Sequence, residues 1–296
     1  MLTLVFLSFH SEHHIRRLVN SIDDKYDIII IENSSNLNLK KEIESKHKNV
    51  NVVVCEENLG FSKGMNLGIK LSKTPYVFLN PSDIEISNES LNKLCGIIKK
   101  YNNFGMLSPV YADKSIHSNF FISNKKNSRI IVETEYGKFP LDEVDIIDGT
   151  IILNKNIIKK DYFDENFFIY FETFDLSKRL VNKNIKLYVC KEITFNHYGG
   201  QSHNKKYNFE AQLSRNWHYN WSKFYYFKKH KSFLYGLRKI LPNFLRAVKK
   251  YVITLSQFNK SDFHEKRKLC EAEIKGIMSS IFLRPSNYRP YKKNNT

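Results

Sequence analysis

Short apolar runs alternate with polar, helix-like segments along the first 56 residues of this 296-residue chain. The runs span 2–8, 27–32 and 50–56, and the middle one contains four consecutive isoleucines with no polar residue between them. Such runs are typical of strands that are buried on both faces. The intervening segments 13–21 and 38–48 have helical character. The order β-α-β-α-β, with right-handed crossovers, predicts a mostly parallel sheet covered by helices.

A helix over 65–72 and a fourth strand over 76–80 continue this pattern, so the first part of the chain predicts an α/β fold. Ligands of such sheets bind at the carboxyl ends of the strands. Polar residues gather at these predicted ends, namely at Ser8, Glu32, 58–64 and 80–83. We therefore expect a nucleotide site at this edge of the sheet.

The pattern is less regular after residue 103. We expect a hairpin within 108–133, a strand over 145–153 and a helix over 171–182. The last third predicts helices, and one of them, over 233–255, is amphipathic and basic. Its apolar stripe comprises Leu234, Leu237, Leu241, Phe244, Leu245, Val248, Val252 and Leu255. This stripe must be buried against either the rest of the protein or a lipid bilayer.

The charge is distributed unevenly along the chain. Of the net charge of +17, residues 203–296 carry +16, because they contain 21 Lys and Arg against 5 Asp and Glu. Residues 1–202 carry only +1. We therefore predict an α/β domain over 1–202 and a basic, mainly helical extension over 203–296. The natural partners of such an extension are phosphates, either of lipid or of nucleic acid.

The cysteines and the apolar segments indicate a cellular compartment. The four cysteines stand far apart and fit neither a metal-ligand motif nor a disulfide framework, which favours a reducing compartment. The apolar start of the chain is too short for a signal peptide, and no apolar stretch reaches membrane-spanning length. We expect a cytoplasmic protein.

Two segments at the predicted strand ends contain groups that suit phosphates and metals. The segment 58–68 combines glycines, a cation at Lys63 and the start of a helix, which suits an anionic diphosphate. The same glycines also suit a turn that only needs close packing. The segment 80–83 ends a strand with oxygen groups of the kind that hard divalent cations prefer. It also fits an ordinary turn that caps the next helix.

Further candidates lie beyond the fourth strand. Glu172 and Asp175 stand three residues apart at the predicted start of a helix, hence on one face. A carboxylate aimed into a pocket can take the proton from an attacking hydroxyl, although acidic residues at a helix start also simply complement the helix dipole. His197 follows an apolar strand over 185–190 and precedes a glycine pair, where it is a candidate ligand.

In combination these segments resemble the rhamnosyltransferase-like branch of glycosyltransferase family two, a group of inverting enzymes. The resemblance covers about residues 2–202 and implies the GT-A fold, a Rossmann-like, mostly parallel sheet covered by helices. The residues that carry it are Ser8 to Ser11, Glu32 to Ser35, Asn58 to Phe61, Asn66 to Ile69, Leu79 to Pro81, Asp148-Gly149, Phe163 to Phe168, Tyr170 to Glu172, Asp175-Leu176, Arg179, His197, Gly199-Gly200 and Ser202.

The resemblance assigns roles to individual positions. It implies that the donor is bound by residues at the strand ends, which are Ser8, Glu32, Asn58, Gly60, Phe61, Lys63, Asn80 and Asp148. Glu32 stands near the nucleoside in the family, and the residues from Asn58 to Lys63 stand near the diphosphate. Asp83 falls at the acidic metal motif, and His197 falls in a segment that contacts metal or diphosphate, so the implied cofactor is Mg²⁺ or Mn²⁺.

Two positions depart from the family pattern. Ser82 is inserted before the aspartate of the metal motif, so either Asp83 reaches over or the metal site is weaker. Thr173 occupies the position of the common base, and a threonine hydroxyl is far too weak a base at neutral pH. We therefore expect Glu172 to be the base, with Asp175 as the second candidate.

The resemblance implies transfer of a sugar from a nucleotide diphosphate donor to a glycan acceptor, with inversion. The implied donor is a deoxyhexose such as rhamnose, and the implied acceptor is a lipid-linked glycan of a surface polysaccharide. The basic extension predicts attachment to an anionic membrane surface, at the inner face, without a span. Two alternatives stay open. The departures at Ser82 and Thr173 are compatible with a nucleotide-sugar-binding protein that has lost turnover. The aromatic and basic run 217–226 also suits a nucleic-acid-binding protein, although we expect no nucleic acid as partner.

Overall fold

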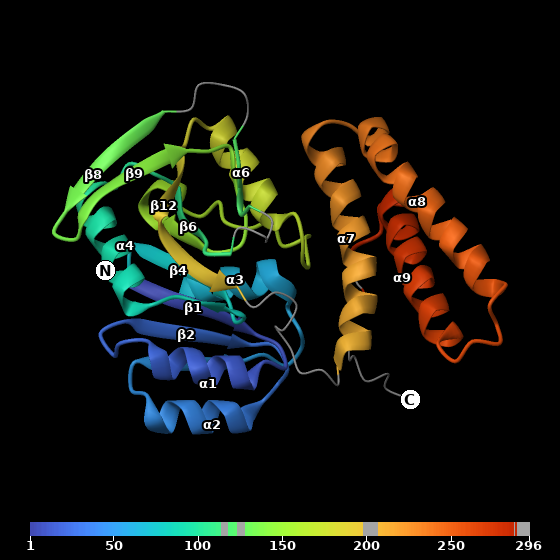
Figure 1. The fold of residues 1–296 in the computed structure, drawn as a ribbon, viewed down its shortest axis with the longest axis horizontal. Coiled ribbons are helices and arrows are strands. Elements are labelled where there is room, and N and C mark those ends of the chain that lie inside the picture. The colour runs from blue at the N-terminus through green and yellow to red at the C-terminus, as the bar shows by residue number, and fades with distance from the viewer. Residues whose placement is uncertain (114–117, 123–127, 198–206, 287, 289–296) are drawn as a thin grey trace. The chain divides into compact units, whose positions relative to one another are not determined.

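The computed structural model describes residues 1–113, 118–122, 128–197, 207–286 and 288 (Figure 1). The chain folds as two compact units. The first unit comprises Met1–Leu59, Lys63–Phe163 and Thr173–His203. The second unit comprises Gly60–Ser62, Asp164–Glu172 and Asn204–Thr296.

The first unit is built on the parallel sheet that the apolar runs predicted. Strands β3 (Val50–Val54), β2 (Asp27–Glu32), β1 (Leu2–Ser8) and β4 (Tyr76–Pro81) lie side by side in this order, and all neighbouring pairs are parallel. The helices that connect or follow them are α1 (Glu12–Ser21), α2 (Leu37–Lys46), α3 (Gly60–Leu71) and α4 (Asn88–Lys100). The α/β fold is confirmed.

Both faces of these strands are buried, which explains the uninterrupted apolar runs. Leu4 and Phe6 of β1 join the main core cluster with residues of α1, α2 and α4. Val5 and Leu7 point to the opposite face, where a Cβ on Gly68 of α3 would lie 2.3 Å from Val5 Cγ1. Because successive side chains of a strand point to opposite faces, a strand covered on both sides is apolar at most positions, and Thr3 is the one polar residue within β1 before its end at Ser8.

The remaining strands extend the sheet beyond β4. The order continues with β11 (Ile151–Asn154), β6 (Met106–Tyr111), β12 (Leu187–His197), β9 (Gly137–Glu143) and β8 (Arg129–Thr134). Strand β11 is antiparallel to both of its neighbours, and β12 is parallel to β6. Short pieces complete the first unit, namely β5 (Ile84–Glu85), β7 (Phe120–Phe121), β10 (Ile146–Ile147), α5 (Lys155–Ile158) and α6 (Glu172–Asn182).

Three expectations about individual elements were wrong. The hairpin is formed by β8 and β9, over 129–143, and not within 108–133. The expected strand over 145–153 is divided into β10 and β11, because Gly149 has a φ of 79° and turns the chain there. Helix α3 begins at Gly60 and not at residue 65, so the glycine-rich segment is itself largely helical.

The described part of the second unit is built mainly from the helices α7 (Asn208–His230), α8 (Phe233–Leu255) and α9 (Phe263–Ile281). Helix α8 has the bounds that its periodicity predicted. Trp217 and Trp221 of α7 are buried and pack with Ala272 of α9. A Cβ on Gly276 would lie 2.2 Å from the carbonyl oxygen of Trp217, so this glycine lets α9 approach α7. The two tryptophans of the aromatic run that suggested nucleic-acid binding are therefore largely buried in the core of the second unit.

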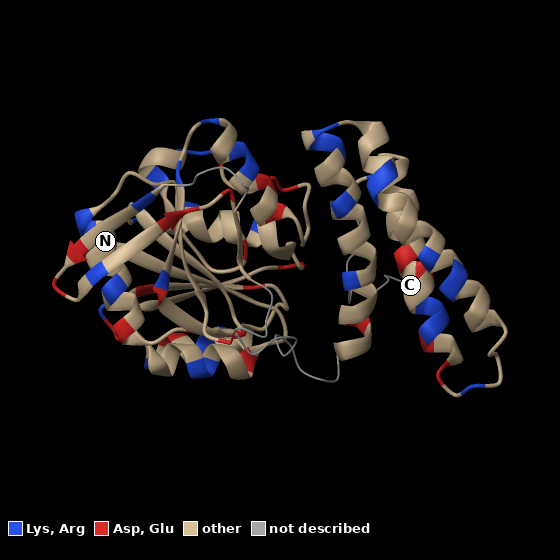
Figure 2. Ribbon diagram, turned by 45° about the horizontal axis from the view of Figure 1, so that its top comes forward, with Lys and Arg blue, Asp and Glu red and all other residues tan. Residues whose placement is uncertain are grey.

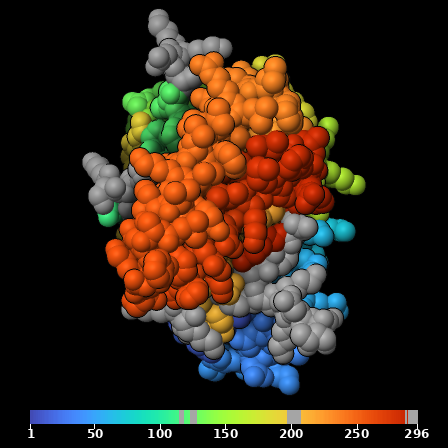
Figure 3. All heavy atoms as spheres, turned by 90° about the vertical axis from the view of Figure 1, so that its right-hand side faces the viewer, coloured from blue at the N-terminus to red at the C-terminus, as the bar shows by residue number. Residues whose placement is uncertain are grey.

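Helix α8 has two apolar faces rather than one stripe. Gly236, Ile240, Asn243 and Ala247 are buried. Another face is exposed to solvent and consists of Leu234, Leu241, Leu245, Val252 and Leu255. Helices α8 and α9 pack together and form one side of the second unit (Figure 3). Among the described residues, no helix is both long and apolar enough to cross a membrane.

Candidate functional site

A chain of hydroxyl groups joins the carboxyl ends of β1 and β4 in the first unit. The Ser82 hydroxyl donates to Ser11 Oγ at 3.1 Å, and the Ser11 hydroxyl donates to Ser8 Oγ at 3.2 Å. All three serines are buried. Ser82, the residue inserted into the metal motif, therefore links the end of β4 to the end of β1. The insertion thus leaves the two strand ends side by side.

Glu32 lies at the same edge, at the end of β2, and is completely buried. Its Oε1 accepts hydrogen bonds from the backbone N–H of Ser34, at 2.6 Å, and from the Ser34 hydroxyl. Burial raises the pKa of the Glu32 carboxyl, although the hydrogen bonds from Ser34 and Ser8 oppose this rise. The carboxyl ends of β1 and β2 thus bring Ser8 and Glu32 together as predicted. Ser34, to which the sequence assigned no role, bonds to Glu32 at this edge.

Asn80 holds the turn that follows β4. Its Nδ2 donates to the carbonyl oxygen of Ile84 at 2.9 Å, and its Oδ1 accepts a hydrogen bond from Thr150 at 2.6 Å. Asn80 and Thr150 are fully buried. These two hydrogen bonds link the turn that contains Asp83 to the start of β11 and thereby stabilise the conformation of this turn.

Asp148 occupies the turn between β10 and β11 and bonds to the residue at the family's base position. The Thr173 hydroxyl donates to Asp148 Oδ1 at 2.6 Å, and the backbone N–H of Gly149 donates to the same oxygen at 3.0 Å. Burial raises the pKa of the Asp148 carboxyl, and the hydrogen bonds from Thr173 and Gly149 oppose this rise. Thr173 thus serves as a hydrogen-bond donor that orients Asp148.

The phenol of Tyr111 connects Asp148 with Asp83. Burial raises the pKa of Tyr111, and the negative charges of Asp148 and Asp83 raise it further. A Cβ on Gly149 would lie 2.9 Å from the Tyr111 hydroxyl oxygen, so only glycine fits this turn without displacing the ring. The Tyr111 hydroxyl therefore lies beside the turn that carries Asp148, and the charges of both predicted aspartates act on it.

The two candidate bases on α6 have different surroundings. Asp175 is completely buried and accepts a hydrogen bond from Arg179 Nε at 2.8 Å. Arg179 also bonds to Asp161 and to the carbonyl oxygen of Tyr162, so it joins α6 to the preceding loop. Glu172 is the first residue of α6 and is buried. The ion pair between Asp175 and Arg179 fits a structural role for Asp175.

The segment before Glu172 is fastened to α7 within the second unit. Lys229 and the Tyr225 hydroxyl both donate to Asp164 Oδ2, at 2.7 and 3.0 Å, and the Ser222 hydroxyl donates to the carbonyl oxygen of Ile169 at 2.9 Å. The Phe168 ring stacks on His218 with 4.4 Å between ring centroids. The family-like run 163–168 therefore anchors the segment that ends in Glu172.

The glycine-rich segment divides between the two units, and its residues have different environments. Lys63 is exposed on α3 and Asn58 is half-buried before this helix. Gly60 has a φ of 74°, and the backbone N–H of Phe61 donates to the carbonyl oxygen of Phe168 at 2.6 Å. A Cβ on Gly60 would lie 2.5 Å from that oxygen, so Gly60 is required for close packing.

Replacing Gly60 by Ala should lower the stability of the fold. The new Cβ would collide with Phe168, and the left-handed backbone conformation itself costs about 1–2 kcal/mol for an L-residue. We expect a loss of at least about 2 kcal/mol in urea unfolding. Gly137→Ala is the matched control, because Gly137 also has a positive φ but a Cβ there meets nothing within 4 Å. Equal losses in the two variants would contradict the packing role.

His197, predicted as a metal ligand, is the last residue of β12, and its backbone lies opposite Ile84 of β5. This pairing places the His197 backbone next to the turn that carries Asp83. Gly199, Gly200 and Ser202 lie outside the described residues. The predicted role of His197 stays a prediction.

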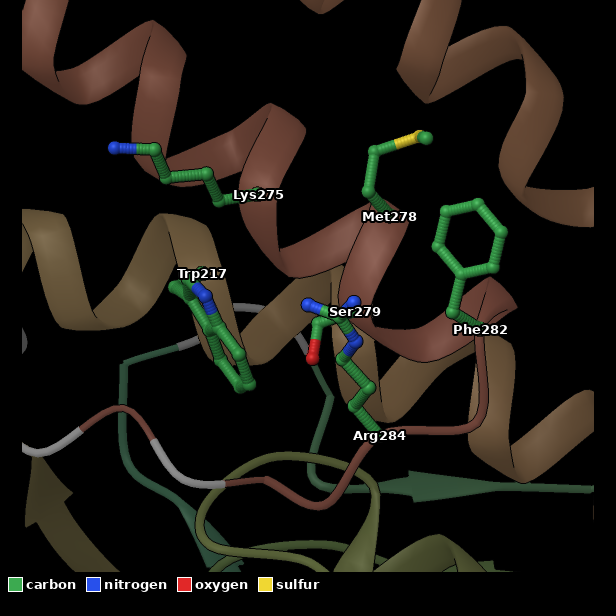
Figure 4. Close-up of a pocket in the computed structure, with 6 residues that line it drawn as sticks. All are labelled: Trp217, Lys275, Met278, Ser279, Phe282 and Arg284. Carbon is green, nitrogen blue, oxygen red and sulfur yellow. The ribbon is translucent and has the colours of Figure 1, made fainter.

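Among the described residues of the second unit, helices α7, α8 and α9 line two pockets of about 320 Å³ each. One is lined by Trp217 of α7, by Lys275, Met278 and Ser279 of α9, and by Phe282 and Arg284 of the following segment (Figure 4). The other, called the basic pocket below, is lined by residues that include Tyr170, Arg215, Tyr219, Arg246, Lys250 and Glu273. Positions of Lys and Arg recur along α7, α8 and α9, and few acidic positions stand between them (Figure 2).

Several residues of these sites had no role assigned to them from the sequence. Tyr111 lies outside every motif, whereas Ser34 lies within the motif at the end of β2 and Thr150 directly follows Asp148-Gly149. The cations of the basic pocket had a signal, because Arg246 and Lys250 are four residues apart on α8 and therefore share a helix face. The sequence predicted a basic amphipathic helix over 233–255 but did not distinguish these two residues from its other cations.

Known proteins resemble this chain in sequence and in fold. The chain matches the model of glycosyl transferase family 2 over residues 3–162, which is more than half of its length. The chain therefore belongs to glycosyl transferase family 2. This family assignment confirms the resemblance in the sequence at the family level.

Individual relatives are distant. The low-salt glycan biosynthesis hexosyltransferase Agl10 of Haloferax volcanii is 23% identical over 207 residues, which is 65% of this chain and 65% of that protein. The mannosyltransferase PcManGT of Pyrobaculum calidifontis, solved with GDP-Man and Mn²⁺, has a TM-score of 0.55 at 9% identity over 95% of this chain and 87% of its own. S. aureus TarS 1-349 with UDP-GlcNAc has a TM-score of 0.52 at 15% identity over 96% and 92%. These structures confirm the GT-A fold.

Proposed function

We propose that this protein is an inverting glycosyltransferase that moves a hexose from a nucleotide diphosphate sugar to a glycan acceptor. The observation that carries the proposal is the group of carboxylates at the strand ends, where Glu32 and Asp83 are buried and Asp148 is oriented by the Thr173 hydroxyl. Burying carboxylates costs stability, and such groups are concentrated at functional sites. Family membership and the glycan-synthesising relative from Haloferax volcanii support the same class of reaction.

In this proposal, Glu172 removes the proton from the acceptor hydroxyl as that oxygen attacks the anomeric carbon from the face opposite the leaving diphosphate. A single displacement of this kind inverts the configuration at that carbon. Lys63, exposed at the first turn of α3, places a cation near the diphosphate. Glu32 and Ser8 at the ends of β2 and β1 bind the nucleoside side of the donor.

The residues at the strand edge fit a divalent cation. The described residues contain no group of three or more His, Cys, Asp or Glu side chains that could hold a metal by themselves. Mg²⁺ sites commonly use only one or two carboxylates and complete their coordination with substrate phosphates and water. Asp83 and Asp148, which both act on the Tyr111 phenol, would hold Mg²⁺ or Mn²⁺ in this way, where the ion would stabilise charge on the departing diphosphate.

The test of this function is a thermal-shift screen against nucleoside diphosphates and their sugar conjugates, with and without Mn²⁺. A ligand that binds only the folded state raises its stability by RT ln(1 + [L]/Kd), so the matching nucleotide gives the largest shift. The donor identified in this way, deoxyhexose donors such as those of rhamnose included, is then tested for sugar transfer and for the configuration of the product. If no nucleotide shifts the unfolding midpoint, the proposed function is wrong.

We further propose that the acceptor is lipid-linked and that the protein binds an anionic membrane at the inner face. The support is the exposed apolar face of α8, where Leu245 and Val252 are 59% and 58% exposed. Cations on the same helix, such as Lys239 and Lys249, are also exposed. An apolar face flanked by cations is typical of helices that lie in a membrane interface.

Exchanging both Leu245 and Val252 for Gln should weaken binding to anionic vesicles at least tenfold, because each aliphatic side chain gains roughly 1.5–3 kcal/mol on full burial. The measurement is co-sedimentation with vesicles of increasing anionic lipid content and salt. Ile131→Gln is the matched control, since Ile131 is 66% exposed on β8 of the first unit. Equal binding to neutral and anionic vesicles, or no binding by the folded wild-type chain, would contradict membrane attachment.

A further inference from the structure

Three cations converge on the basic pocket in the second unit from two different helices. Arg215 belongs to α7, whereas Arg246 and Lys250 belong to α8. The carboxylate of Glu273, on α9, is buried and lies 3.9 Å from Arg246, which is beyond hydrogen-bond distance. Among the described residues, neither Arg215 nor Lys250 forms an ion pair with a carboxylate. The pocket therefore has a net charge of about +2.

The wall of the basic pocket contains a buried polar network, while the side chains of Arg246 and Lys250 are exposed to solvent. Asn243 is buried and donates to Asn220 Oδ1 at 2.7 Å, while its own Oδ1 accepts from Lys223 at 3.2 Å. Burial lowers the pKa of the Lys223 ammonium, and the nearby charge of Arg246 lowers it further. Clustering like charges in this way costs stability, which a bound anion would offset.

The basic pocket also adjoins the segment that carries the candidate base. Tyr170 lines the pocket, and its ring meets that of Tyr219 edge-on with 5.7 Å between centroids. Burial raises the pKa of Tyr170 to about 12, Arg215 opposes this rise, and Glu172 adds to it. Tyr170 and Arg215 both line the pocket, and Tyr170 stands two residues before Glu172 in the chain. Tyr170 and Phe171 both have positive φ values, of 71° and 66°, a conformation that is costly for non-glycine residues.

We propose that the basic pocket binds a phosphate group of the acceptor substrate, such as the diphosphate that joins a glycan to its carrier. Two arginines and a lysine suit a doubly charged phosphate, because the planar guanidinium can donate two parallel hydrogen bonds to phosphate oxygens. The inference rests on the proposed function, in which Glu172 touches the acceptor hydroxyl. A phosphate in the pocket would hold the acceptor beside Glu172, whereas the donor diphosphate belongs to Lys63 and the strand edge of the first unit.

The test is a titration of the full-length protein with inorganic pyrophosphate and with a short alkyl diphosphate, at fixed salt. Arg215→Gln and Arg246→Gln should each raise the dissociation constant of the alkyl diphosphate about tenfold or more, since a charge-assisted hydrogen bond contributes about one such factor. Arg238→Gln removes the same charge from an exposed position of α8 outside the pocket and should leave the constant unchanged. Unfolding midpoints verify that every variant is folded.

Equal weakening by Arg238→Gln would show that only the overall charge matters, and would overturn the proposal. Loss of diphosphate binding on Lys63→Ala, with binding kept in both pocket variants, would assign the ligand to the donor site and also overturn it. Sedimentation with phosphatidylglycerol vesicles separates the two sources of phosphate. We expect Arg215→Gln to leave sedimentation unchanged, and a loss of vesicle binding without a loss of alkyl diphosphate binding would assign the pocket to membrane lipid.

The nucleotide screen separates failure of the pocket from failure of the proposed function. If nucleoside diphosphates stabilise the protein and the pocket variants bind alkyl diphosphate like the wild type, the pocket assignment is wrong and the proposed function stands. If no nucleotide binds but the pocket variants lose alkyl diphosphate binding, the phosphate site stands and its assignment to an acceptor is wrong.

Discussion

Glu172→Gln should lower turnover by roughly 100-fold or more while the affinity for the donor stays nearly the same. General-base catalysis contributes a factor of this size, and the amide of Gln preserves the shape of the side chain but takes no proton. The measurement is kcat and KM under donor saturation, together with the thermal shift caused by the donor nucleotide. A buried residue with a merely structural role would instead lower the unfolding midpoint and impair donor binding as well.

Asp175→Asn is the matched control for Glu172. Because Asp175 accepts from Arg179, its replacement weakens an ion pair that joins α6 to the preceding loop, so we expect a lower unfolding midpoint and a smaller loss of turnover. If Glu172→Gln stayed active and a folded Asp175→Asn did not, the assignment of the base would be reversed. If both variants and the wild type lacked transfer but bound nucleotide, the chain would be a nucleotide-sugar-binding protein that has lost turnover.

The parallel strands of the first unit could be predicted from the sequence because strands that are buried on both faces appear as short, nearly uninterrupted apolar runs. Strand β2 consists of one acidic residue at each end and four isoleucines between them. Helix α8 was predictable for a related reason, since its apolar residues recur with helical periodicity and Ser232 caps its start. These elements depend on local patterns that a single sequence displays.

The start of α3 and the site geometry depend on contacts between distant residues. Gly60 has low helix propensity, and tertiary packing against Phe168 overrides it. The hydrogen bond between Thr173 and Asp148 joins residues 25 positions apart, and no local sequence pattern near either residue predicts it. Family resemblance could mark Thr173 as a departure from the common base, but only the structure shows the hydroxyl as a donor that orients Asp148.

Asp148→Asn should abolish most of the activity and yet leave the fold as stable as the wild type or more stable at neutral pH. The amide oxygen of Asn can still accept the hydrogen bonds from Thr173 and Gly149, so the local structure is kept. The carboxylate charge, which the proposed function uses to hold the cation at the donor diphosphate, is lost. We expect turnover to fall by about 100-fold or more and the response of the donor affinity to Mn²⁺ to decrease.

The stability of the wild type and that of the Asp148→Asn variant should depend differently on pH, because burial raises the pKa of the Asp148 carboxyl in the folded wild type. Between the pKa of the unfolded chain, near 3.8, and the raised folded pKa, the native state binds more protons, so wild-type stability falls as pH rises through this window. The Asp148→Asn variant lacks this pH-dependent loss of stability. In urea unfolding with chelator, its free energy of unfolding should therefore equal that of the wild type below about pH 4. Its excess over the wild type should reach full size above the folded pKa of Asp148. Thr173→Val is the control, since it removes only the donor and should raise that pKa further. An Asn variant that is less stable than the wild type at every pH would show that Asp148 serves the fold and not the reaction.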